Sequence, residues 1–262
     1  MRIALFDSGF GGLTVLGHAR RVLPSEEFLF FADRDHVPYG TKSVPAVRGF
    51  VRAAFRFLVE KQKADAVVVA CNTATSVAVD EMRRLYGVPI VGMEPAVKKA
   101  LAYDSERRVL VTGTPITING EKLRHLVSVY DTKGLIDLLA LPRLVEFAER
   151  KEFVSPRVEE YLRNALAPYE MIQYSAIVLG CTHFNYFKDT LRCLLPKTVR
   201  FVDGNEGTVE ELARRAELHT VPPGTQKAAC TFFESGRPVM GMKALARIES
   251  YLERAERMEE VV

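Results

Sequence analysis

The sequence predicts an α/β protein made of two similar domains with mainly parallel sheets. Short apolar runs alternate with stretches of helical periodicity along the chain, which is typical of strands joined by crossover helices. Because these runs show no polar alternation, they suit strands that are covered on both faces, as in a parallel sheet. Four such runs end at small or polar residues, at 3–6, 66–70, 109–111 and 176–179.

Two segments carry a clear helical pattern. In 43–63 the apolar residues recur every three or four positions, and Ser43 and Pro45 are typical of a helix start. Residues 242–259 show an amphipathic pattern of the same period. We therefore expect helices over both segments, packed against the faces of the sheets.

The strand ends recur along the chain, which indicates a duplicated architecture. Ile3 precedes Val109 by nearly as many residues as separate Cys71 from Cys181. We expect two halves related by a pseudo-two-fold axis, with the functional site in the cleft between them. The predicted boundaries place residues 1–95 plus 206–262 in the first domain and residues 96–205 in the second.

Composition and charge argue against several classes of protein. The 36 Lys and Arg residues barely outnumber the 33 Asp and Glu residues, so we expect no nucleic-acid partner. The longest apolar runs, such as 66–71, are far shorter than the roughly 20 residues of a membrane span. The apolar run before Asp7 is too short for the core of a secretory signal, so we expect a cytoplasmic protein.

The sequence has four cysteines, at positions 71, 181, 193 and 230. They are too sparse for a disulfide scaffold, and none has the CxxC spacing of zinc ligands, so we expect no metal. Cys193 and Cys230 fit buried packing positions. Cys71 and Cys181 each follow a predicted strand, where a helix N-terminus lowers a thiol pKa from about 8.5. Such a thiol can act as a nucleophile or a general base.

Polar side chains gather at the same strand ends, beyond which open α/β sheets bind their ligands. These residues are Asp7, Ser8, Asn72, Thr73, Thr114, Thr117, Thr182 and His183. Taken singly, the Ser, Thr and Asn side chains fit helix caps, but four clusters together favour an anion site. His183 could orient or deprotonate Cys181, and Asp7 could do the same for Cys71.

Two thiols on opposite walls of one cleft suggest a reaction that inverts a carbon centre. A base on one face would remove a proton from a stereogenic carbon, and an acid on the other face would deliver one. The hydroxyl and amide donors would hold a dicarboxylate between the walls.

Five motifs follow one another between residue 3 and about residue 205. They are Phe6-Asp7-Ser8-Gly9-Phe10-Gly11-Gly12-Leu13, Val37-Pro38-Tyr39-Gly40-Thr41-Lys42-Ser43, Val69-Ala70-Cys71-Asn72-Thr73-Ala74, Gly113-Thr114 followed by Thr117, and Leu179-Gly180-Cys181-Thr182-His183. In this order the motifs resemble those of the glutamate racemase family.

The resemblance implies a role for each of these residues. Cys71 and Cys181 would be the two acid/bases, with Cys71 acting on D-glutamate and Cys181 on the L form. Asp7, His183 and Glu149 would assist the thiols. The substrate would be bound by Ser8, Pro38, Tyr39, Gly40, Asn72, Thr73, Thr114, Thr117 and Thr182.

The resemblance further implies a cofactor-free enzyme, usually a homodimer, that makes D-glutamate for bacterial peptidoglycan. Leu141-Pro142 stands where the family usually has Cys-Pro, so the assisting carboxylate is placed at Glu149 by spacing, with Glu146 as the alternative. After His183 the chain reads Phe184-Asn185-Tyr186 where the family commonly has Tyr-Pro, which would reshape the pocket wall.

Three other interpretations fit part of the pattern. A related cofactor-free racemase acting on aspartate or a hydantoin would use the same two thiols. The glycines at 9, 11 and 12 suggest a dinucleotide-binding oxidoreductase, but the sixth motif position is Thr14, and Asp7 would repel a pyrophosphate. A non-catalytic carboxylate-binding module would explain the Thr, Ser and Asn side chains but not the paired thiols.

Overall fold

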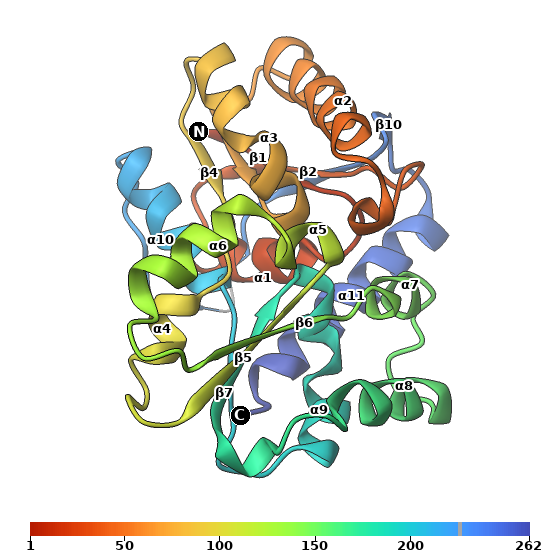
Figure 1. The fold of residues 1–262 in the computed structure, drawn as a ribbon. Coiled ribbons are helices and arrows are strands. Elements are labelled where there is room, and N and C mark those ends of the chain that lie inside the picture. The colour runs from red at the N-terminus through yellow and green to blue at the C-terminus, as the bar shows by residue number, and fades with distance from the viewer. Residues whose placement is uncertain (225–226) are drawn as a thin grey trace.

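The strands form two separate sheets in the computed structural model, which describes residues 1–224 and 227–262 (Figure 1). The first sheet has six strands in the order β10-β9-β2-β1-β3-β4. Its strands are β1 (Arg2–Asp7), β2 (Glu27–Ala32), β3 (Ala66–Val69), β4 (Ile90–Gly92), β9 (Cys230–Glu234) and β10 (Arg237–Pro238). Its neighbouring strands pair in parallel, except that β10 runs antiparallel to β9.

The second sheet repeats the arrangement of the central strands of the first. Its four strands pair in parallel in the order β6-β5-β7-β8. They are β5 (Arg108–Gly113), β6 (Ile136–Ala140), β7 (Tyr174–Gly180) and β8 (Arg200–Val202). The order β2-β1-β3-β4 is thus matched by β6-β5-β7-β8, so that β1 corresponds to β5 and β3 to β7. The predicted class, two similar α/β units with mainly parallel sheets, is confirmed.

Helices cover the sheets of both units. Those of the first unit are α1 (Leu13–Val22), α2 (Val44–Phe55), η2 (Arg56–Lys61), α3 (Asn72–Leu85), α10 (Asn205–Arg215) and α11 (Met242–Glu259). Those between β4 and α10 are α4 (Val97–Leu101), α5 (Pro115–Ile118), α6 (Glu121–Tyr130), α7 (Arg143–Glu149), α8 (Pro156–Leu166) and α9 (Lys188–Leu194). Three short turns of 3-10 helix complete the chain: η1 (Tyr39–Thr41), η3 (Met171–Gln173) and η4 (Thr182–Phe187).

Both predicted helices are present. The predicted helix over 242–259 is α11. The segment 43–63 forms α2, whose N-cap Ser43 accepts a hydrogen bond from the Ala46 N–H, and then continues as the π-helical turn η2. Among the described residues, no helix is long and apolar enough to cross a membrane.

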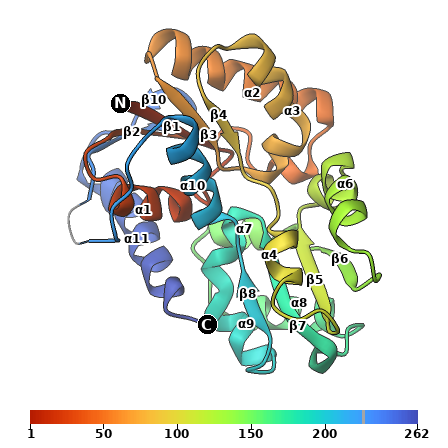
Figure 2. The same ribbon diagram turned by 90° about the vertical axis from the view of Figure 1, so that its left-hand side faces the viewer.

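The chain passes between the two sheets twice, between β4 and β5 and again between β8 and β9. The boundaries expected at residues 95 and 205 stay a prediction. Figure 2 shows α11 running from the side of α1 down toward α9, so it lies against both units. Its Arg254 side chain donates hydrogen bonds to the Tyr186 carbonyl in η4, at 2.8 and 3.2 Å.

The apolar core continues from one unit into the other. One buried cluster contains Leu5 and Phe28 of the first sheet together with Leu110 and Ile177 of the second. Burying a side chain of this size stabilises a fold by about 1.5–3 kcal/mol. This shared packing holds the two units together. The site lies where the carboxyl ends of their strands face each other.

Candidate active site

The candidate site lies where the carboxyl ends of β1, β3, β5 and β7 meet. The residues predicted from the strand ends are buried together there. They are Asp7, Ser8, Cys71, Asn72, Thr73, Thr114, Thr117, Cys181, Thr182 and His183. Cys71 and Cys181 follow the corresponding strands β3 and β7 and are 5% and 6% exposed. The two thiols therefore come from equivalent positions of the two units.

On the first wall, Cys71 connects to Asp7 through a serine. The Cys71 thiol donates to Ser8 Oγ at 3.5 Å, and the Ser8 hydroxyl donates to Asp7 Oδ1 at 3.3 Å. The direct contact between Asp7 and Cys71 that the sequence suggested is not the arrangement found. Ser8 lies between them because Asp7 ends β1 and its other oxygen accepts from the Thr182 hydroxyl at 2.9 Å.

The pKa of Cys71 differs from the expectation. The thiol is the N-cap of α3 and accepts from the Ala74 N–H at 3.5 Å, which favours the thiolate. Burial and the negative charge of Asp7 outweigh this and raise the pKa of Cys71 to about 12. The expected lowering at a helix N-terminus is therefore wrong here, and Cys71 is a neutral thiol at neutral pH.

On the second wall, Cys181 connects to Glu149 through His183. Cys181 Sγ lies 3.9 Å from His183 Nδ1, and His183 Nε2 lies 2.7 Å from Glu149 Oε1. Burial alone would lower the pKa of His183, but hydrogen bonds to Cys181 and Glu149 raise it well above its usual value. The raised pKa favours the protonated form of His183, and the Gly11 N–H also approaches Nε2, at 3.3 Å.

Glu149 is the carboxylate that meets His183. It ends α7, and its Oε1 also accepts from the Phe10 N–H at 2.7 Å. Burial alone would raise the pKa of Glu149, but its contacts with His183 and Arg34 lower it below the usual value. Glu146, the alternative that the sequence left open, lies on the exposed face of the same helix. The structure thus places Glu149, not Glu146, beside the imidazole of His183.

Asp7 links the two walls. Besides the Thr182 hydroxyl, it accepts from the Gly9 N–H at 3.0 Å. Burial raises the pKa of Asp7, and the charge of His183 opposes that rise. The two thiols also interact electrostatically, since negative charge on Cys181 raises the pKa of Cys71.

Threonine hydroxyls join the two units beside the thiols. Thr73 of α3 and Thr114, at the end of β5, lie 2.8 Å apart between their Oγ1 atoms. Thr114 Oγ1 lies 3.1 Å from that of Thr117. Asn72 donates to the Met93 carbonyl at 3.3 Å, and its buried Oδ1 has no hydrogen-bond partner among the described residues. This row offers donors and acceptors to a charged ligand.

The predicted segment Pro38-Tyr39-Gly40 forms the rim of the site. Pro38 is the N-cap of η1, Tyr39 is buried, and Gly40 packs so closely on Thr114 that a Cβ atom there would lie 2.5 Å from the threonine Cβ. The Tyr39 hydroxyl donates to Asp33 Oδ2 at 2.6 Å. Asp33 was not among the residues predicted from the sequence. It directly follows β2, so the reasoning that selected polar residues at strand ends would also have selected Asp33.

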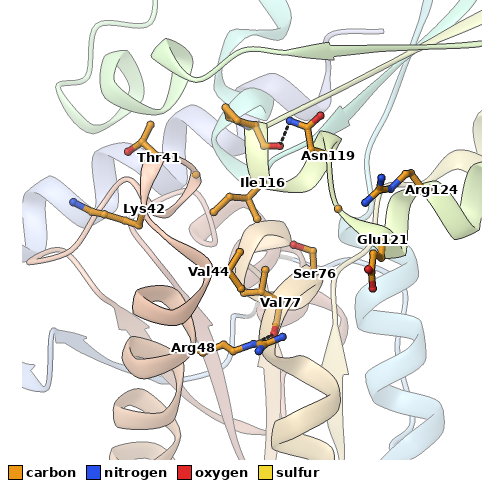
Figure 3. Close-up of a pocket in the computed structure, with 13 residues that line it drawn as sticks. Thr41, Lys42, Val44, Arg48, Ser76, Val77, Ile116, Asn119, Glu121 and Arg124 are labelled. Carbon is orange, nitrogen blue, oxygen red and sulfur yellow. Dashed lines mark hydrogen bonds between the residues drawn. The ribbon is translucent and has the colours of Figure 1, made fainter.

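A pocket of about 690 Å³ opens outside this rim (Figure 3). It includes Gly40 and is lined from both units, with Lys42 and Arg48 on one side and Ile116 and Arg124 on the other. Because the two thiols are almost fully buried, a ligand can reach them only if the two units move apart.

The two remaining cysteines lie away from the thiol pair. Cys230 is half-buried and packs against the core, in keeping with its expected role. Cys193 is exposed, so its predicted burial is wrong, because it lies on the outward face of α9. Over residues 1–224 and 227–262, no group of three or more His, Cys, Asp or Glu side chains could hold a metal ion.

Comparison with known proteins identifies the family. The model of the family described as Asp/Glu/Hydantoin racemase matches residues 16–212, which is more than half of the chain. The chain belongs to this family. The predicted family resemblance and the predicted isomerase class are thereby confirmed.

Individual members of this racemase family align over almost the whole chain. The glutamate racemase of Campylobacter curvus is 47% identical over 100% of both chains. The crystal structure of Thermus thermophilus glutamate racemase with beta-chloro-D-alanine is 33% identical, with a TM-score of 0.71 over 100% of this chain and 94% of that one. Escherichia coli glutamate racemase, solved with L-glutamate and the activator UDP-MurNAc-Ala, is 26% identical, with a TM-score of 0.79 over 97% and 94%.

Proposed function

We propose that this protein interconverts L- and D-glutamate, with Cys71 and Cys181 as the two acid/base groups. The observation that carries the proposal is the pair of buried thiols at equivalent strand ends, each with its own polar relay. Glutamate as the substrate is supported by the names of the relatives and by the L-glutamate complex of the Escherichia coli protein. Asp7, His183 and Glu149 assist the thiols in this proposal.

The proposed reaction is a proton transfer across the substrate. In the L-to-D direction the Cys181 thiolate takes the Cα proton, and the electron pair of the C–H bond moves into the α-carboxylate. The Cys71 thiol then delivers its proton to the opposite face and becomes a thiolate. A neutral Cys71, with a pKa of about 12, suits the delivering role, and the His183 imidazolium offsets negative charge on Cys181.

The carbanion needs strong stabilisation, since the Cα proton of an amino acid is only weakly acidic. We propose that the substrate carboxylates are held by the donors of Ser8, Asn72, Thr73, Thr114, Thr117 and Thr182, with Pro38, Tyr39 and Gly40 forming the wall. Preorganised donors of this kind contribute about 3–4 kcal/mol each to a transition state with developing negative charge. Burial of the site keeps water away and strengthens their effect.

The wider roles in the proposal rest on the family resemblance. They are production of D-glutamate for bacterial peptidoglycan, a cytoplasmic location and a homodimer. The dimer is checked by light scattering of the purified full chain. The substrate is checked by circular dichroism during incubation with L-glutamate, L-aspartate or a 5-substituted hydantoin. Loss of optical activity with glutamate is expected, and loss with aspartate or the hydantoin alone would contradict the proposal.

The close approach of Gly11 to the second wall makes it a sensitive position. A Cβ atom at Gly11 would lie 2.3 Å from Thr182 Oγ1 and 2.5 Å from His183 Nδ1. Gly11→Ala should therefore displace the groups that meet Cys181 and Asp7, and a misplacement of about 1 Å costs about 100-fold in rate. The measurement is kcat for glutamate racemisation.

Gly17→Ala is the matched control, because a Cβ atom there meets only Leu252 at 3.8 Å and Arg21 at 3.9 Å. This change lies inside α1, so it should leave kcat unchanged and slightly increase stability. If Gly11→Ala kept the kcat of the Gly17→Ala variant, the tight packing of the second wall would not matter for the reaction.

A further inference from the structure

Arg34 lies behind the second wall and meets the far side of Glu149. It follows β2, and its guanidinium lies over the Phe10 ring at 4.2 Å from the ring centroid. Its Nη1 is 3.3 Å from Glu149 Oε2. The Arg34 side chain is 22% exposed, the Glu149 side chain 9% and the His183 side chain 2%.

The two oxygens of Glu149 therefore have separate partners. Oε1 is occupied by the Phe10 N–H and by His183. Oε2 and Arg34 Nη1 are both buried, and neither makes a hydrogen bond to another group among the described residues. Arg34 Nη1 is thus the charged group that faces Oε2, and the carboxylate lies between Arg34 and His183.

The balance of charge explains why a second cation is needed. The ionisable groups that face Glu149 and His183 are Asp7, Arg34, Cys181, Tyr186 and Tyr251. Asp7 and Glu149 are carboxylates that repel each other, whereas the burial of both tyrosines keeps them neutral. Arg34 and a protonated His183 supply two positive charges against the two carboxylates and the Cys181 thiolate of the proposed mechanism. Without Arg34, a proton is favoured on one of the buried carboxylates.

We infer that Arg34 is a positioning residue that keeps Glu149 ionised and turned toward His183, and so supports proton transfer at Cys181 alone. This inference rests on the proposed function and deepens it. Arg34 lies outside the five motifs that marked the site in the sequence. Its direct contact is with the second wall, whereas the Cys71 thiol meets Ser8 and, through it, Asp7.

The chain offers a matched control for Arg34. Arg247 of α11 also lies over the Phe10 ring, at 5.0 Å from the centroid, but its ion pair is with Glu234. Arg34→Met and Arg247→Met therefore remove the same charge from the same ring, and only the first removes a partner of Glu149. Arg34→Lys restores the charge without the planar guanidinium.

The experiment measures racemisation in both directions with protiated and Cα-deuterated glutamate, on variants whose folding is checked by circular dichroism. Because the two enantiomers have equal free energy, kcat/KM must fall equally in both directions. We expect about a 10-fold fall for Arg34→Met, which is about 1.4 kcal/mol of transition-state stabilisation, because Glu149 loses the charged group that faces its Oε2. Arg34→Lys should recover most of the rate, and Arg247→Met should match the wild type.

The isotope effects distinguish positioning from general loosening of the fold. If transfer at Cys181 becomes slower, the deuterium isotope effect on kcat/KM rises for L-glutamate, which Cys181 deprotonates, and falls for D-glutamate. Equal changes in both directions, or the same loss in Arg247→Met, would overturn the inference. Wild-type rates in Arg34→Met would overturn it while leaving the proposed function intact, whereas a wild-type protein without racemase activity would overturn the proposed function itself.

Discussion

Replacing either Cys71 or Cys181 by alanine is expected to abolish the interconversion of L- and D-glutamate. Each thiol handles the proton on one face of the substrate, and no other acid or base of the proposed mechanism is placed to replace it. General acid–base catalysis by a positioned group contributes about 10²–10⁴-fold, so the loss of one thiol should reduce kcat by about 10⁴-fold. The measurement is the rate of change of optical rotation with each enantiomer.

Cys193→Ala is the control for this experiment. Cys193 is exposed on α9 and lies outside the site, so its removal should leave kcat unchanged. Cys71→Ser and Cys181→Ser keep the shape of the site, and their low activity would show that thiol acidity, not packing, is required. Substantial racemisation by either alanine variant would rule out a mechanism with two essential thiols.

The Glu149→Gln variant is expected to lose about 10–100-fold in kcat at neutral pH, because a smaller fraction of His183 then carries the positive charge that supports Cys181. In the wild type, the contact with Glu149 helps to raise the pKa of His183. Without the carboxylate, burial lowers that pKa, so His183 loses its proton at a lower pH. The activity that depends on imidazolium is present below the His183 pKa and lost above it. The alkaline limb of the pH profile should therefore move toward lower pH.

Glu146→Gln is the matched control, since Glu146 lies one helical turn away on the exposed face of α7. It should keep both the wild-type rate and the wild-type pH profile. An unshifted profile in Glu149→Gln would mean that the charge of Glu149 does not act on His183. The ionisable groups that face this pair are Asp7, Arg34, Cys181, Tyr186 and Tyr251.

The residues around the two buried thiols could be found from the sequence because a parallel sheet places its strand ends at one edge. Cys71 and Cys181 end equivalent apolar runs, and the structure places them after β3 and β7 of two units with the same strand order. Periodicity also located α11 correctly, since the pattern of an amphipathic helix can be recognised without knowing which element the helix packs against.

The second layer around the site could not be found in this way. Arg34 and Tyr251 reach Glu149 through tertiary contacts between distant segments; the Tyr251 hydroxyl donates to the Glu149 carbonyl at 3.2 Å. The pKa of Cys71 depends on burial, which outweighs the helix N-terminus and is fixed only when the two units meet. The exposure of Cys193 depends in the same way on the orientation of α9.

Incorporation of solvent deuterium into the product is the most direct test of whether two thiols act on opposite faces of the substrate. Unlabelled L-glutamate is incubated in heavy water for the first few per cent of conversion, and the hydrogen at Cα of each enantiomer is read by mass spectrometry after chiral separation. We expect deuterium at Cα in the D-glutamate formed, delivered by Cys71, while the remaining L-glutamate stays largely protiated. D-glutamate that retains the original proton would contradict it, because a single base would then be carrying that proton from one face to the other.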